Sequence, residues 1–379
     1  MNTDLMTNPL HRLSELGQAV WLDHISRPFV REGNLEKHIN EDLLKGITSN
    51  PAIFDEALSA GDACDEDIRA LSAGDPDPEE VFTRLAVKDI QDAADLFRPL
   101  YDDSMGEHGF VSLEVPPGLA HDSAASIETG RRLWQALERP NVMIKIPGTR
   151  EGLEAIRTLL SEGISINVTL LFGLPRYREV TQAFIDGLRT RLDDAHAATR
   201  IASVASFFLS RIDSEIDPRL DRIAETKSSK AGLARSLRGK AAIASAKLAH
   251  QIHQEVFKSE AFEPLEQFGA RHQRLLWAST SAKDPAYSDL KYIEPLVGAK
   301  TINTMPLKTL EACRDHGKPA PSLDDGVEES REVFDRLKEL DIDIDEVTAK
   351  LEREGVEKFK KSYDSLLETV REKLSAIHV

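Results

Sequence analysis

Eight short segments rich in β-branched and apolar residues alternate with stretches of helical spacing, and this alternation constrains the fold more than any other feature. Each segment has the length of one strand. Strands that alternate with helices form either a closed (β/α)8 barrel (TIM barrel) or a doubly wound open sheet, and the number of segments favours the barrel. We expect strands over 20–25, 46–50, 110–115, 142–147, 165–172, 201–208, 274–280 and 301–306.

The clearest helix lies between the fourth and fifth segments. Its apolar residues recur on one face, at Leu153, Ile156, Leu159 and Leu160. Thr149 is expected to cap the first turn, and Gly163 stands where a helix commonly ends. The chain from 142 to 172 is therefore predicted to form one strand–helix–strand unit.

The domain organisation follows from the intervals between the segments. Two long intervals carry helical patterns, and we expect them to be helical insertions near 52–105 and 213–272 of a barrel domain over 1–320. From residue 321 the chain is dense in Glu, Lys and Leu at helical spacing, which predicts a helical C-terminal extension over 321–379 packed on the barrel. There Phe359 and Tyr363 share one helical face, and either cover the barrel mouth as a lid or dock the helix elsewhere.

The charge and the cysteines exclude several classes of protein. The chain has 48 basic and 65 acidic residues, a net charge of −17. This field repels nucleic acid and anionic membranes as partners, although a local cluster of donors can still bind a small anion. Cys64 and Cys313 form no C-x-x-C pair, so a disulfide framework is not expected. Without a signal peptide pattern or a long apolar run, we expect a cytoplasmic protein.

One lysine stands alone in the fourth segment. Lys145 alternates with Ile144 and Ile146, so its side chain projects from the opposite face of the strand. In a barrel this face points toward the axis, and Lys145 lies near the C-terminal end of its strand, where barrel enzymes hold their chemistry. For this residue alone, a structural salt bridge explains the pattern equally well.

Polar residues on three other segments have the same parity: Asp23, Ser112, Glu114, Asn167 and Thr169. Burial disfavours the ammonium form of a lysine, and the free amine is a nucleophile. An amine attacks a carbonyl to give an imine, whose cationic nitrogen accepts electrons when the neighbouring carbon–carbon bond breaks. Asp23 and Glu114 could transfer the protons that these steps require. The residue types therefore indicate Schiff-base aldol chemistry.

Arg211 follows the sixth segment, where barrel loops often bind phosphate. Its guanidinium group offers paired donors to such an anion. An ion pair with Asp213 or Asp217 is an equally good explanation.

A metal or a cofactor is not expected. His250 and His253 stand three residues apart on a predicted helix, but no third ligand accompanies them, so a solvated or interface role is expected instead. No P-loop, dinucleotide-binding or zinc-protease motif occurs in the chain.

Several segments in combination resemble the transaldolase family, particularly its longer bacterial branch. The resemblance extends from about residue 17 to 317 and rests on the runs 17–23, 46–54, 111–115, 141–147, 166–172, 203–208 and 276–280. It implies a (β/α)8 barrel enzyme of the non-oxidative pentose phosphate pathway. Such an enzyme transfers a dihydroxyacetone unit from sedoheptulose 7-phosphate or fructose 6-phosphate to glyceraldehyde 3-phosphate or erythrose 4-phosphate.

The resemblance also implies roles for individual residues. Lys145 matches the imine-forming lysine, and Asp23 matches the aspartate that takes the hydroxyl proton during carbon–carbon cleavage. Glu114 and Thr169 match the pair that holds and activates a water molecule. The expected substrate-binding residues are Asn50, Ser112, Asn167, Ser206, Phe208, Arg211, Ser279 and Lys283.

One position departs from the family pattern. The phosphate-binding arginine expected shortly after the seventh strand is absent, and Lys283 is expected to take its place. Two other functions fit the residues: an aldolase that releases free dihydroxyacetone, and a catalytically silent barrel that binds sugar phosphates. Both a monomer and a homodimer are compatible with the sequence.

Overall fold

The barrel predicted from the sequence is confirmed. The computed structural model describes residues 8–74, 76–194, 196–227 and 229–377. Eight parallel strands pair in sequence order and close into a barrel, so the open-sheet alternative is wrong. Each predicted segment overlaps one strand, and the strands are β1 (Ala19–Asp23), β2 (Gly46–Thr48), β3 (Phe110–Glu114), β4 (Val142–Pro147), β5 (Ile166–Leu171), β6 (Ser203–Phe208), β7 (Arg274–Ala278) and β8 (Ile302–Met305).

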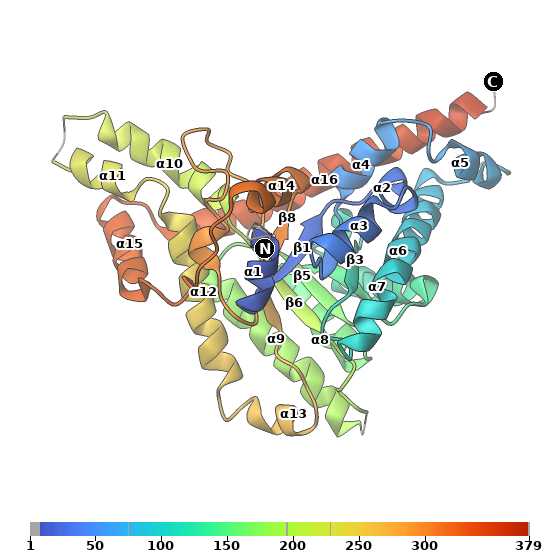
Figure 1. Ribbon diagram of the computed structural model, residues 1–379, viewed down its shortest axis with the longest axis horizontal. Helices are drawn as coiled ribbons and strands as arrows, with labels where there is room; N and C mark the ends of the chain where they lie inside the picture. Colours follow the sequence, from blue (N-terminus) through green and yellow to red (C-terminus); the bar gives the residue numbers. More distant parts are fainter. Residues whose placement is uncertain (1–7, 75, 195, 228, 378–379) are drawn as a thin grey trace, which may run out of the picture.

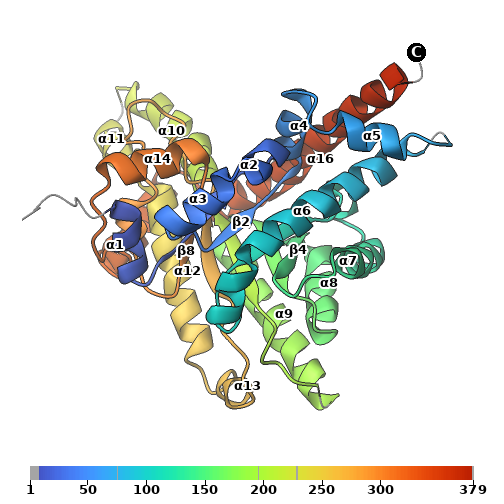
Figure 2. The same ribbon diagram turned by 45° about the vertical axis from the view of Figure 1, so that its right-hand side comes forward.

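Helices surround the barrel (Figures 1 and 2). Up to β6 the helices are α1 (Pro9–Glu15), α2 (Arg27–Arg31), α3 (Asn34–Glu41), α4 (Pro51–Ser59), α5 (Asp65–Leu71), α6 (Pro78–Asp103), the 3₁₀ turn η1 (Pro117–Leu119), α7 (Ser123–Leu137), α8 (Arg150–Ser161) and α9 (Leu174–Asp193). After β6 they are α10 (Ser210–Ala224), α11 (Ala231–Leu237), α12 (Ala241–Phe257), α13 (Glu263–Gln267), the 3₁₀ turn η2 (Glu294–Leu296), α14 (Leu307–His316), α15 (Val327–Glu339) and α16 (Ile344–Ile377).

The local signals around α8 determine its ends as expected. The Thr149 hydroxyl accepts a hydrogen bond from the Gly152 amide at 3.0 Å, which satisfies one of the free amides of the first turn. Gly163 follows the last turn with φ +90°, a conformation that glycine adopts without a steric penalty. These two positions show why a helix forms between β4 and β5.

The exit of β5 departs from regular pairing. The register between β5 and β6 shifts between Val168 and Leu171. Leu170 has φ +58°, which is strained for a residue with a Cβ atom. The strict alternation expected along this strand therefore ends at Thr169, where the bulge begins to redirect the chain. Bulges of this kind are common beside functional sites.

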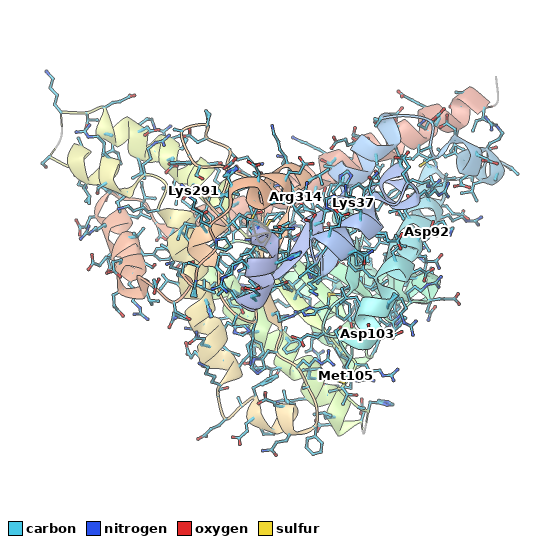
Figure 3. All side chains as sticks on the ribbon, viewed as in Figure 1. Lys37, Asp92, Asp103, Met105, Lys291 and Arg314 are labelled. Carbon is cyan, nitrogen blue, oxygen red and sulfur yellow. The ribbon has the colours of Figure 1, made fainter. Side chains whose placement is uncertain are left out.

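The long helix α16 crosses the C-terminal end of the barrel (Figures 1 and 2). It packs against α4, α6, α10, η1 and β5. At Gly355 the approach is close, because a Cβ atom there would lie 3.2 Å from Leu170 Cδ2. Met105, which is 82% exposed, lies at the other end of the molecule (Figure 3). The helical extension is thus located where the strands end.

The two histidines of α12 correct one expectation. His250 and His253 are each only 8% exposed, so neither is solvated. His253 packs against Phe257 with ring centroids 4.7 Å apart, and its Nε2 lies 3.0 Å from the Gln273 carbonyl oxygen. Burial lowers the pKa of His253 to about 3, which keeps the ring neutral in the core. The solvated role was wrong because the segment between α13 and β7, which contains Gln273, packs against this face of α12.

Cys64 and Cys313 are both buried and unpaired. Across the ranges that the structure describes, no helix has both the length and the apolar character needed to cross a bilayer.

Packing between β1 and β2 generates a prediction about stability. A Cβ atom on Gly46 would lie 2.5 Å from the Trp21 ring and 2.7 Å from the Phe110 carbonyl oxygen. Because Trp21 is fully buried, we expect Gly46→Ala to lower the free energy of unfolding by about 1–3 kcal/mol through overpacking. Urea denaturation measures this change.

Gly232→Ala is the matched control. Gly232 lies in α11, and no heavy atom lies within 4 Å of the position of an added Cβ atom. Alanine there is expected to stabilise the protein by about 0.5–1 kcal/mol through helix propensity. Equal effects of the two substitutions would contradict the proposed role of close packing at Gly46.

Candidate active site

A cavity of about 330 Å³ opens at the C-terminal end of the barrel, below α16. Nine of the residues predicted for the site line it: Asp23, Asn50, Lys145, Thr169, Ser206, Phe208, Arg211, Ser279 and Lys283. The three other predicted residues, Ser112, Glu114 and Asn167, lie on β3 and β5. Glu114 contacts Lys145, Asn167 contacts Ser206, and Ser112 contacts Asn167. Parallel strands bring residues of distant sequence position to the same end of the barrel.

Lys145 lies at the base of the cavity with its side chain 5% exposed. The register pairs Lys145 of β4 with Glu114 of β3 and Asn167 of β5, so all three occupy one level of the barrel. Lys145 Nζ lies 3.1 Å from Glu114 Oε2 and donates a hydrogen bond to the Ser49 carbonyl oxygen at 2.9 Å. The amine therefore has as its partner one of the two carboxylates that strand alternation placed on the same face.

Glu114 has acceptor capacity that the protein does not use. Within the described residues, Glu114 Oε2 faces Lys145 Nζ at 3.1 Å, whereas Glu114 Oε1 and Thr169 Oγ1 have no hydrogen-bond partner. Burial raises the pKa of Glu114, although the positive charge of Lys145 opposes this shift. Buried polar atoms normally have partners, so Glu114 and Thr169 present a polar surface suited to a small hydroxylic molecule.

Asp23 approaches the cavity from the end of β1. Its Oδ1 accepts a hydrogen bond from the Thr48 hydroxyl at 2.8 Å, and Thr48 Oγ1 lies 2.9 Å from Thr304 Oγ1. Burial is the main cause that raises the pKa of Asp23, and the charge of Lys145 opposes it. The site thus combines the amine of Lys145 with two carboxyl groups, Asp23 and Glu114, and burial raises the pKa of both carboxyl groups.

A chain of hydrogen bonds crosses the floor of the cavity. Ser206 Oγ donates to Asn167 Oδ1 at 2.7 Å, and Asn167 Nδ2 donates to Ser112 Oγ at 3.0 Å. Only Ser206 of the three lines the cavity. Ser112 and Asn167 therefore hold Ser206 in position from below, since such a network restricts the rotamers of its members.

Two predicted residues at the rim also have structural roles. The Asn50 side chain accepts a hydrogen bond from the Ile53 amide at 3.2 Å and caps α4. Ser279 has φ +54°, and its Oγ lies 2.9 Å from Ser210 Oγ at the start of α10. Both side chains are consequently held in place at the mouth of the cavity.

Arg211 faces the cavity and not its own helix. Its guanidinium carbon lies 5.6 Å from the centre of the Phe208 ring and 5.8 Å from that of Phe359. The ion pair considered with Asp213 or Asp217 is wrong, because Asp213 pairs with Lys291 at 3.0 Å and Asp217 accepts from the Tyr287 hydroxyl at 2.6 Å. Lys291, the partner of Asp213, is labelled in Figure 3.

Phe359 and Tyr363, which were expected to share one face of the C-terminal helix, contact different parts of the protein. Phe359 lines the cavity, with its ring centre 5.7 Å from Lys145 Nζ. Tyr363 packs against Phe82 of α6, with ring centres 5.7 Å apart. Phe359 therefore covers the amine, as the lid hypothesis required, whereas Tyr363 docks the helix.

Sequence reasoning missed several residues of the cavity. Thr48 and Thr304 have the inward parity of their strands, so the alternation used for Lys145 could have found them. Lys358 and Ser362 of α16 also line the cavity. For these two no sequence signal exists, because a polar residue of a long amphipathic helix is typical of a solvated face.

No cluster of three or more metal-ligating side chains occurs in the part of the chain that the structure describes. The polar groups that line the cavity are lysine amines, a guanidinium group, an amide, hydroxyl groups and carboxylates. An amine beside carboxylates is suited to proton transfer and carbonyl addition.

Comparisons with known proteins agree with this chemistry. The family model of transaldolase/fructose-6-phosphate aldolase matches residues 20–370. A transaldolase of Saccharopolyspora erythraea is 47% identical over 96% of this chain and 97% of its own length. Transaldolases of Thiobacillus denitrificans (45%, covering 94% and 97%) and Trichodesmium erythraeum (42%, covering 98% and 99%) are similarly close. The chain therefore belongs to the transaldolase family, and it is an enzyme that transfers a dihydroxyacetone unit.

Proposed function

We propose that the enzyme transfers this unit between sugar phosphates through a Schiff base on Lys145, in the non-oxidative pentose phosphate pathway. The donor is sedoheptulose 7-phosphate or fructose 6-phosphate, and the acceptor is glyceraldehyde 3-phosphate or erythrose 4-phosphate. The observation that carries the proposal is the buried amine of Lys145 at the base of the cavity, 3.1 Å from Glu114.

The first half of the reaction forms the imine. Glu114 accepts the ammonium proton of Lys145, and the raised pKa of this carboxyl group favours that transfer. The free amine then attacks the ketose carbonyl carbon, and the resulting carbinolamine loses water to give the imine. Glu114 and Thr169, with their unused hydrogen-bonding capacity, support the proton transfers of this step through a bound water molecule.

The second half breaks and forms the carbon–carbon bond. Asp23 takes the proton of the substrate hydroxyl group, the bond between the third and fourth carbons breaks, and the bonding electrons move toward the imine nitrogen. The aldose leaves, and the three-carbon unit stays on Lys145 as an enamine. An acceptor aldehyde then reverses these steps, and water releases the ketose product. Ser206, Asn50 and Ser279 are positioned to bind hydroxyl groups of the sugar.

Retention of the intermediate requires that water does not reach it before the acceptor. Phe359 of α16 lies over Lys145 and Phe208 lines the adjacent wall. These aromatic groups support transfer over the release of free dihydroxyacetone. They therefore favour this proposal over the aldolase that the description of the family also names.

Borohydride trapping tests the imine directly. Incubation with fructose 6-phosphate and sodium borohydride is expected to reduce the imine and leave a stable adduct on Lys145, which mass spectrometry of the peptides locates. Lys145→Met should give no adduct and lose essentially all activity. Substrate binding without an adduct in the unmodified enzyme would favour the silent barrel. Rapid release of free dihydroxyacetone in the absence of an acceptor would favour the aldolase.

Glu114→Gln tests the role in proton transfer. Glutamine preserves the shape but cannot exchange the proton, so kcat is expected to fall about 10²-fold or more, whereas KM should change by less than about threefold. Steady-state and single-turnover kinetics separate the two effects. A large increase in KM with normal kcat would show that Glu114 binds substrate only.

The pH dependence tests Asp23. This carboxyl group must be ionised to take the hydroxyl proton, and burial raises its pKa above 3.8. We therefore expect kcat/KM to fall as the pH is lowered, with the loss beginning at a higher pH than for an exposed aspartate. In Asp23→Asn the contribution of this group should be missing from the acid limb, which keeps the titrations of Glu114 and of the substrate phosphate. An identical profile in both proteins would contradict the assignment.

A further inference from the structure

Three cations from separate parts of the chain line the mouth of the cavity. They are Arg211 at the start of α10, Lys283 in the loop after β7 and Lys358 of α16. Within the described residues, no carboxylate lies at ion-pair distance from any of the three. In a chain with a net charge of −17, three unpaired cations around one cavity form a local positive field that favours an anionic ligand.

The cations are close enough to influence one another. Lys283 donates a hydrogen bond to Ser281 Oγ at 2.6 Å, and Ser281 also lines the cavity. Burial, followed by the positive charges of Lys358 and Arg211, lowers the pKa of Lys283. Like charges held together in this way repel one another, and an anion between them would remove the repulsion.

A lysine on a helix surface often forms an ion pair with a carboxylate one turn away, but Lys358 does not. Its neighbour four residues earlier, Glu354, lies 3.5 Å from Lys350, and the residue four positions later is Ser362. The two carboxylates that line the cavity are Asp23, which accepts from Thr48, and Glu56 of α4. Neither is within ion-pair distance of Lys358 in the described structure.

We propose that Lys358 binds the phosphate group of the sugar substrate together with Arg211 and Lys283. This inference rests on the proposed function, because it assumes a phosphorylated substrate in this cavity. A phosphate monoester carries nearly two negative charges and three acceptor oxygens, which three cationic donors can share. Lys283 and Lys358 then supply the charge that an arginine after β7 provides in the family pattern.

The position of Lys358 gives phosphate binding a second consequence. Phe359, the next residue of α16, covers Lys145. A phosphate group bound between α16 and the barrel stabilises the arrangement in which Phe359 occupies that position, since a ligand stabilises the state that binds it. Phosphorylated substrates therefore hold α16 against the barrel mouth while the imine is present.

Lys358→Gln tests the proposal, with Lys361→Gln as the matched control. Lys361 is an exposed lysine of the same helix outside the cavity, so its substitution changes the net charge equally. We expect Lys358→Gln to raise KM for fructose 6-phosphate roughly 10-fold or more. It should weaken inhibition by inorganic phosphate to a similar degree, while kcat changes less than about threefold. Lys358→Arg should restore most of the loss, and Lys361→Gln should have little effect.

Amide hydrogen exchange provides a readout besides activity. Inorganic phosphate should slow exchange in residues 355–363 of the unmodified enzyme and of Lys361→Gln, but not of Lys358→Gln. Equal KM, phosphate inhibition and exchange in the two glutamine variants would overturn the proposal.

The proposal and the proposed function can fail separately. If Lys358→Gln behaves like its control but borohydride still labels Lys145, the Schiff-base mechanism stands and the phosphate role of Lys358 is wrong. If borohydride labels no lysine, the mechanism fails. Calorimetric titration with inorganic phosphate then still shows whether Lys358→Gln weakens anion binding more than Lys361→Gln does.

Discussion

The contact between Lys145 and Glu114 is the interaction on which the site depends. An ammonium group inside a closed barrel is strongly destabilised unless a counter charge accompanies it. The register of β3 and β4 places the two residues at the same level, with the charged atoms 3.1 Å apart. The pair keeps an amine at the base of the cavity, and burial raises the pKa of its carboxylate partner. A substitution that removes Glu114 would leave Lys145 buried without compensation.

The barrel by itself leaves the base of the cavity accessible from above, and α16 completes the enclosure. Gly355 allows the helix to approach Leu170 at the bulge of β5. One turn later Phe359 lies over Lys145, and Tyr363 anchors the same helix on Phe82. The strained exit of β5, the glycine of α16 and the aromatic cover of the amine therefore form one continuous packing arrangement. This arrangement would protect the proposed intermediate on Lys145 from water.

The charges of the site are divided between its two levels. At the base, Lys145 is balanced by Glu114, and Asp23 is held by Thr48. At the mouth, Arg211, Lys283 and Lys358 have no carboxylate partner in the described part of the chain. A sugar phosphate matches this division, since its carbonyl end reaches the amine while its phosphate end remains among the cations. The proposed substrate class thus agrees with the electrostatics at both ends of the cavity.

The sequence alone was sufficient to predict the barrel, and nine of the predicted site residues line the cavity. Alternation along a strand is a local property, so the inward direction of Lys145, Glu114 and Asp23 followed from their neighbours. The same rule placed Asn167 correctly, but it could not show that this residue supports Ser206 from beneath the cavity floor. Depth within a barrel depends on the stagger of neighbouring strands, which no single segment encodes.

Only the tertiary structure decided which distant segments meet at the cavity mouth. Lys358 and Phe359 lie more than two hundred positions after Lys145 in the chain, and their helical spacing is the same for a solvated face, a docked face or a lid. His253 was misread for the same reason, since it contacts His272 and Gln273 in the segment between α13 and β7. Local patterns determine how a side chain is directed relative to its own backbone. The packing of whole surfaces against one another determines what that side chain contacts.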